Sequence, residues 1–192
     1  MEILRDIPGE FKELCQVDFE DMTLGRKAAI MSKGGYVVRS TDRYEKPMIE
    51  AELPNGFNNA MIELYTDEYR SMKYHSDMAL DLAEGSKIAI YSCYPEEEKN
   101  RRKLIVKDKV SGCRKEFVLE NRSMIKFSLE TNRECVHKIV GRGVWLGITY
   151  RKSKTIGTFR RATEEEKKEL YKLRTKENRE VDFKWPEIEY QI

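Results

Sequence analysis

A run of short, β-prone segments between residues 36 and 151 constrains the fold more than any other feature of this sequence. Turn-forming residues separate many of these segments, and Val110-Ser111-Gly112-Cys113 has the composition of a tight hairpin. Because no helical pattern intervenes, the sequence predicts a mainly β fold with flanking helices, such as a sandwich, barrel or jelly roll. The segments include YVVRS (36–40), NAMIELY (59–65), SKIAIYSCY (86–94), CVHKIV (135–140) and VWLGITYR (144–151).

Both ends of the chain have a different pattern, although its length of 192 residues fits a single domain, 1–192. We expect residues 1–35 to be a helical and loop segment, with LGRKAAIM (24–31) as a short helix. The β core would then cover 36–161. Residues 162–192 would form a C-terminal helix and tail, because Thr163 and Glu166 make a capping box.

Composition limits the functional classes. The 36 basic and 34 acidic residues nearly cancel, so net charge gives no argument for a nucleic-acid partner. We see no signal peptide and no apolar run long enough to cross a bilayer, so we expect no membrane partner. The four cysteines have no CxxC spacing, which fits reduced thiols and a cytoplasmic location.

The two histidines of the chain carry the main chemical hypothesis. His75 and Asp77, in KYHSD, point to the same face if this stretch is extended, and His137 is the remaining histidine. Two imidazoles and one carboxylate form the facial triad of non-haem Fe(II) oxygenases. A surface hydrogen bond between His75 and Asp77 is the plainer alternative, and Cys135 offers another, a four-ligand zinc site.

The last strand of the core offers a site for an acidic cosubstrate. In VWLGITYR, alternation places Thr149 and Arg151 on one face with Trp145. A hydroxyl and a guanidinium at i and i+2 suit a carboxylate, which arginine binds through two parallel hydrogen bonds.

The order NNAMIELY, KYHSD, SKIAIYSCY, SMIKFSL, CVHKI and VWLGITYR resembles the AlkB-like Fe(II)/2-oxoglutarate-dependent dioxygenases over about residues 57–155. The resemblance implies a double-stranded β-helix, a jelly-roll variant related to cupins. It implies that His75, Asp77 and His137 hold Fe(II), and that O2 and the cosubstrate 2-oxoglutarate react there. Arg151, Tyr65 and Thr149 would then bind 2-oxoglutarate.

Two departures from that family concern the cosubstrate. The first of the two arginines that the family carries on the last strand falls on Trp145, and the asparagine before the tyrosine is Glu63. Arg142 or a lysine is the alternative grip for the carboxylate.

The resemblance implies hydroxylation or demethylation, with alkylated nucleic acid as the first substrate hypothesis. The basic cluster KNRRK (99–103) would be its contact, although a solvated loop explains that cluster as well. Hydroxylation of a small molecule or a protein side chain is the alternative. Alternatives of another class are a zinc-binding module and a non-catalytic relative.

Overall fold

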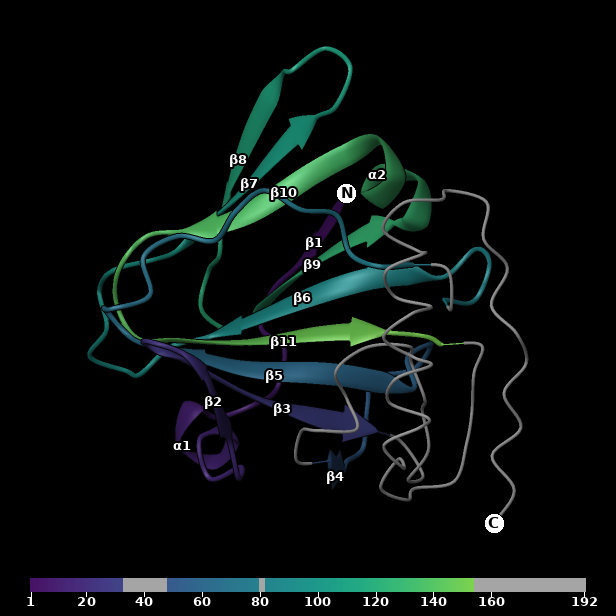
Figure 1. Ribbon diagram of the computed structural model, residues 1–192. Coiled ribbons are helices and arrows are strands. Elements are labelled where there is room, and N and C mark those ends of the chain that lie inside the picture. Colours follow the sequence, from purple (N-terminus) through teal and green to yellow (C-terminus); the bar gives the residue numbers. More distant parts are fainter. Residues whose placement is uncertain (33–47, 80–81, 154–192) are drawn as a thin grey trace, which may run out of the picture.

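Two facing sheets make up most of the computed structural model, which describes residues 1–32, 48–79 and 82–153 (Figure 1). In this part of the chain the larger sheet has eight strands in the order β1-β9-β6-β11-β5-β3-β2, with β4 paired to β3, and the smaller has the order β10-β7-β8. All the strand pairs are antiparallel except β3 with β4. The prediction of a mainly β fold with few helices is therefore confirmed.

The elements follow one another along the chain as β1 (Glu2–Leu4), α1 (Phe11–Leu14), β2 (Glu20–Thr23), β3 (Arg26–Ser32), β4 (Met48–Glu50), β5 (Asn59–Tyr65), β6 (Lys87–Cys93), β7 (Lys103–Asp108), β8 (Arg114–Val118), β9 (Ser123–Ser128), α2 (Leu129–Glu134), β10 (Cys135–Val140) and β11 (Trp145–Arg151). The predicted strand 36–40 and the predicted helix and tail 162–192 lie outside the described residues. No helix of the described residues is long and apolar enough to cross a bilayer.

The N-terminal segment corrects one prediction. Residues 24–31 were expected to form a short helix within a helical segment 1–35, but Arg26–Ser32 is strand β3, paired with both β2 and β5. Its AAIMS stretch is buried throughout. A strand buried on both faces shows a continuous apolar run, which local periodicity does not distinguish from a buried helix.

The larger sheet has two buried faces. One face packs against the N-terminal segment, which contributes Leu4, Ile7, Phe11 and Leu14 to a cluster with Ile62, Leu146 and Ile148. The other face packs against the smaller sheet, and its core contains Ile88, Ile90, Ile125 and Trp145 from the larger sheet with Leu104 and Ile139 from the smaller. Arg151 of β11 and Glu63 of β5, which are discussed below, share this second face with Trp145 and Tyr65.

The smaller sheet continues into a projecting hairpin, β7–β8 (Figure 1). Its predicted turn is confirmed: Gly112 adopts φ +71°, and the Asp108 carboxylate accepts hydrogen bonds from the backbone N–H groups of Val110 and Ser111. Along the opposite edge, the segment 71–75 pairs with β10 through bridges at Ser71↔Val140 and His75↔His137.

Candidate metal centre and its surroundings

His75 and His137 lie directly opposite each other on paired backbones. The N–H of His75 donates to the carbonyl of His137 at 3.0 Å, and the N–H of His137 donates back at 2.7 Å. The two ring centroids are 4.5 Å apart. Two distant parts of the sequence are thus joined at the histidines themselves, so the backbone sets the spacing of the imidazoles.

Asp77 completes a cluster of three ligand groups with these histidines. One ligand atom from each residue lies within 4.8 Å of the other two. Asp77 Oδ1 is 3.8 Å from Nε2 of His75 and 3.8 Å from Nε2 of His137, too long for hydrogen bonds. Cis donors of an octahedral ion lie about 3 Å apart, so a metal would draw Asp77 and each imidazole together by about 1 Å and the two imidazoles by up to about 2 Å. The donor types fit an iron(II) ion once side-chain rotations close these distances.

The hydrogen bond of His75 sets its tautomer. Nδ1 lies 3.1 Å from the carbonyl oxygen of Lys73, which can only accept, so Nδ1 carries the proton. Nε2 then keeps its lone pair and is ready to bind a metal. The His75 side chain is 44% exposed, whereas that of His137 is 9% exposed, so the cluster opens to solvent on the His75 side.

Asp77 is held at its carboxylate and at its main chain. Arg151 donates to Oδ2 from Nε at 3.0 Å and also from Nη2, which leaves Oδ1 directed at the histidines. The side chain of Asn132 accepts from the backbone N–H of Asp77 at 2.9 Å and donates to its carbonyl at 2.8 Å. Such outer partners orient metal ligands, and their loss weakens metal binding.

Burial keeps His137 neutral. It lowers the pKa of His137 to about 4, and the charges of His75 and Arg151 act in the same direction, although Asp77 opposes them. A neutral imidazole is the form that binds a metal. Phe127 packs edge-on against the His137 ring, with centroids 5.7 Å apart.

The predicted cosubstrate residues are engaged within the protein. Arg151 binds the carboxylate of Asp77, and its Nη1 donates to the carbonyl of Thr149 at 3.3 Å. Thr149 is partly buried in the middle of β11, opposite Met61. Tyr65 is fully buried, and its hydroxyl lies 3.5 Å from Glu63 Oε1.

Glu63 forms the centre of a second polar cluster, which we call the Glu63 cluster and which comprises Arg26, Glu63 and Tyr65. Arg26 Nε donates to Glu63 Oε1 at 2.8 Å, and Nη2 donates to the same oxygen. Burial would lower the pKa of Arg26, but Glu63 and the nearby tyrosines outweigh it and raise that pKa. Burial, followed by the Glu63 charge, raises the pKa of Tyr65 well above its usual value, so its hydroxyl stays protonated.

Trp145 lies over Gly147 on the same face of β11. A Cβ atom built on Gly147 would come within 2.0 Å of Trp145 Cη2, so the indole covers the position where a larger side chain would stand. Trp145 is 1% exposed and packs edge-on against Tyr65, with ring centroids 4.9 Å apart. Because Gly147 pairs with Glu63, the indole and the Glu63 cluster occupy the same region of the sheet.

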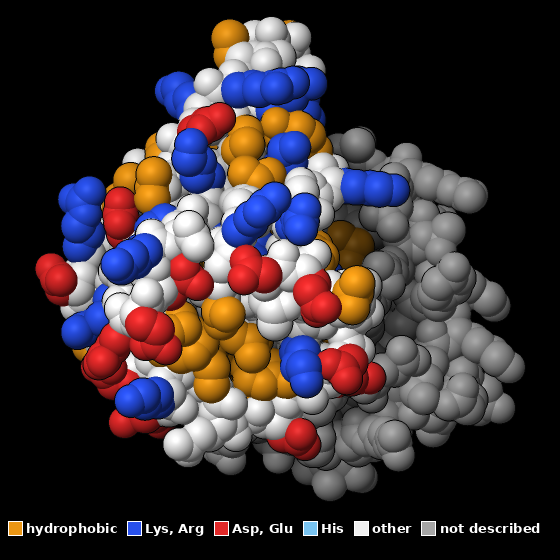
Figure 2. All heavy atoms as spheres, turned by 90° about the vertical axis from the view of Figure 1, so that its left-hand side faces the viewer, with side chains coloured by type: hydrophobic (Ala, Val, Ile, Leu, Met, Phe, Trp, Pro, Cys, Tyr) orange, Lys and Arg blue, Asp and Glu red, His pale blue; other side chains and the backbone are white. Residues whose placement is uncertain are grey.

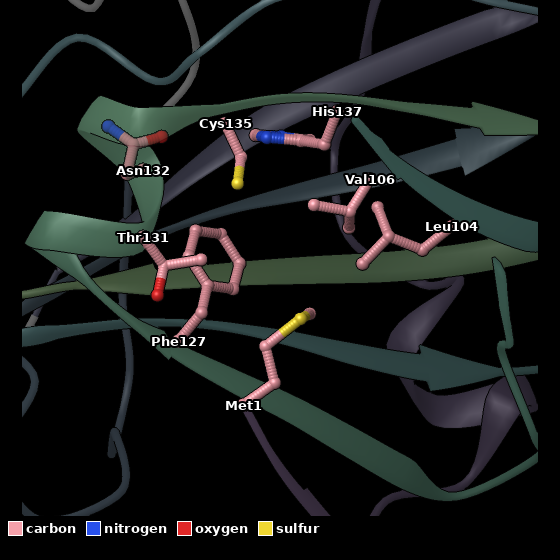
Figure 3. A pocket seen from close by; sticks show the side chains of 8 residues that line it. All are labelled: Met1, Leu104, Val106, Phe127, Thr131, Asn132, Cys135 and His137. Carbon is pink, nitrogen blue, oxygen red and sulfur yellow. The ribbon is translucent and has the colours of Figure 1, made fainter. Parts of the chain in front are cut away.

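An apolar groove adjoins His137 on the side of α2 (Figure 3). It has an empty volume of about 220 Å³, open to solvent, and is lined by Met1, Leu104, Val106, Phe127, Thr131, Asn132, Cys135 and His137. Cys135 lines this groove and does not belong to the ligand cluster found in the described residues. Burial, with Asp108 and Glu134 nearby, raises the pKa of its thiol, which disfavours the thiolate needed for zinc.

The basic cluster 99–103 has a structural role at Arg102. This side chain is fully buried and donates to the backbone carbonyls of Thr66, Tyr69, Gly141 and Gly143. Figure 2 shows Lys and Arg gathered at the projecting hairpin, with acidic and basic side chains interspersed below it. The burial of Arg102 and the mixed charges below the hairpin do not indicate a continuous basic surface through residues 99–103.

Asn132 and Arg26 were missed by sequence reasoning. Asn132 lies in the short helix α2, whose N-cap Ser128 accepts from the Thr131 N–H. Arg26 fell in the segment expected to be helical. No local signal marks the partner of either residue, because Asp77 and Glu63 are 55 and 37 residues away.

No protein-family model matches this chain, and no curated protein matches it either. Among solved structures, the chain is similar to that of OsALKBH1, with a TM-score of 0.41 and 15% sequence identity. The match covers 54% of this chain and 52% of the other, so it spans about half the length of that protein.

Proposed function

We propose that this chain is an iron(II)-dependent oxygenase that uses a 2-oxo acid as cosubstrate, built on a double-stranded β-helix. The observation that carries the proposal is the cluster of His75, Asp77 and His137, whose ligand atoms lie within 4.8 Å of one another. Two imidazoles and one carboxylate leave coordination positions open for a cosubstrate and O2. Iron held there would supply the chemistry of dioxygen activation coupled to decarboxylation.

The surrounding side chains support this function. Arg151 fixes Oδ2 of Asp77 and so aims Oδ1 at the imidazoles, while Asn132 holds the Asp77 backbone. The burial of His137 keeps its ring unprotonated, and Phe127 packs edge-on against it. The exposed side of His75 leaves a route by which the reactants enter.

The groove beside His137 favours hydroxylation of an apolar fragment over demethylation of a nucleic acid. Its lining is mostly apolar, with Met1, Leu104, Val106 and Phe127 beside the His137 ring. The basic cluster that would contact a phosphate backbone has its Arg102 buried among carbonyls. We therefore propose a small molecule or a protein side chain as the substrate, with alkylated nucleic acid as the second candidate.

Anaerobic titration of the metal-free protein with Fe(II) tests the centre. We expect one iron per chain, and consumption of a 2-oxo acid when O2 is admitted. Cys135→Ala is the matched control, because Cys135 lies on the same strand as His137 but outside the ligand cluster. It should bind iron like the unmodified chain, whereas tight zinc that is lost in Cys135→Ala would establish the zinc alternative instead.

A further inference from the structure

Two ion pairs lie toward opposite ends of β11 on the inner side of the larger sheet. Strands β3, β5, β6 and β11 contribute inward-facing positions, and among these the arginines are Arg26 and Arg151. Arg151 binds Asp77, and Arg26 binds Glu63. Both arginines therefore already have a carboxylate partner from the chain itself.

Few inward-facing positions of β11 separate the two ion pairs. Along β11, Arg151 is followed on the same face by Thr149 and then by Gly147, which lies about 13 Å from Arg151 at about 3.3 Å per residue. Trp145 covers Gly147, and Tyr65 reaches back to Glu63. Among the inward-facing positions of β11, Thr149 is thus the one that is only partly buried.

A second carboxylate at the far end of a cosubstrate would meet the Glu63 carboxylate and the indole of Trp145. Glu63 already occupies Arg26, the cation that such a carboxylate would need, so the second carboxylate would be left without a counter-charge. Glu63 thus takes the position of the distal carboxylate, bound by Arg26 and Tyr65 as an external acid would be.

We infer that the site accepts a short 2-oxo monocarboxylic acid and discriminates against 2-oxoglutarate, with Glu63 and Trp145 as the specificity-determining residues. This inference rests on the proposed function, because it assumes that iron at His75, Asp77 and His137 chelates a 2-oxo acid. In the coupled reaction the 2-oxo acid loses CO2 and takes up one oxygen atom of O2, which yields a carboxylic acid one carbon shorter. The other oxygen atom of O2 enters the oxidised substrate.

Binding calorimetry under anaerobic conditions tests the inference on the Fe(II)-loaded protein with pyruvate, 2-oxobutyrate, 2-oxopentanoate and 2-oxoglutarate. The last two acids have equal chain length and differ by the distal carboxylate, so their comparison isolates the charge. We expect 2-oxoglutarate to bind at least about tenfold more weakly than 2-oxopentanoate because of Glu63. We expect 2-oxobutyrate to bind more tightly than 2-oxopentanoate because of Trp145.

Glu63→Gln removes the negative charge, keeps the side-chain size and releases Arg26. It should improve 2-oxoglutarate binding at least about tenfold and leave 2-oxobutyrate binding nearly unchanged. Glu116→Gln, at an exposed ion pair with Lys103 on the hairpin, is the matched control and should change neither. The series of four acids on the unmodified protein remains decisive if Glu63→Gln does not fold.

Tighter binding of 2-oxoglutarate than of 2-oxopentanoate would overturn the inference while leaving the proposed function in place. An unchanged ratio in Glu63→Gln would overturn the role of Glu63. Iron at the triad without affinity for any of the four acids would overturn the inference and the choice of a 2-oxo acid. A protein that binds no iron would overturn both proposals.

Discussion

The metal cluster and the Glu63 cluster each pair a carboxylate with an arginine of the larger sheet, and they use their carboxylates in opposite ways. Asp77 gives one oxygen to Arg151 and keeps the other directed at two imidazoles. At the Glu63 cluster, a single oxygen of Glu63 receives two donor nitrogens of Arg26 and faces the hydroxyl of Tyr65. The first arrangement leaves ligand atoms directed at a common point, and the second satisfies its charge internally. Under the proposed function, the first arrangement would hold the metal and the second would select the acid by its shape and charge.

Removal of a histidine should abolish the function of the metal end. In His137→Ala we expect Fe(II) affinity to fall more than about 100-fold, because even outer partners of metal ligands contribute about 10–100-fold. Equilibrium titration with Fe(II), followed by metal analysis after desalting, measures this loss. Arg26→Met, at the other cluster, should bind iron normally, and equal losses in both variants would erase the distinction between the two ends.

Loss of Arg151 tests whether its partner is Asp77 or an external acid. Arg151→Met leaves the carboxylate of Asp77 buried without its cation, which should lower the free energy of unfolding by about 3–5 kcal/mol. Urea denaturation of the metal-free protein measures the change. Asp77→Asn together with Arg151→Met should recover much of the stability, since the pair is then removed as a unit. A stability unaffected by Arg151→Met would contradict the pair.

The metal end was largely predictable from the sequence, and the Glu63 cluster was not. The i, i+2 rule and the scarcity of histidine led to His75, Asp77 and His137, because these relations are local or forced by number. The alternation of β11 predicted Arg151 as a partner for the carboxylate of a cosubstrate, whereas the carboxylate that it binds in the structure is that of Asp77. The partner of Glu63 depends on β3, whose continuous apolar run predicted a helix.

The pH dependence of stability provides a smaller test at the metal end. The pKa of His137 is about 4 in the folded chain and about 6.5 as an ordinary value, so the unfolded chain takes up this proton first as pH falls. The metal-free protein should therefore lose up to about 3 kcal/mol of stability from this group between pH 6.5 and 4, with no further loss below. The Gln side chain in His137→Gln cannot titrate, so the free energy of unfolding from urea denaturation should depend less on pH in this variant. The same pH dependence in both proteins would contradict the prediction.

Gly147→Ala tests the packing of Trp145 beside the Glu63 cluster, and its effect on stability should be the smallest of those predicted. The added Cβ would come within 2.0 Å of the Trp145 indole, which Tyr65 holds from the side. Overpacking of this kind costs about 1–3 kcal/mol, so urea denaturation should show that loss in the Trp145 background. In a Trp145→Ala background the same substitution should cost little, because the indole that it meets is absent, and a double-mutant cycle isolates this coupling. Equal costs in both backgrounds would show that the strain comes from the backbone of β11 and not from the indole. Fe(II) affinity should stay unchanged in Gly147→Ala, since Asp77 is held by Arg151 and Asn132 and not by this part of the strand.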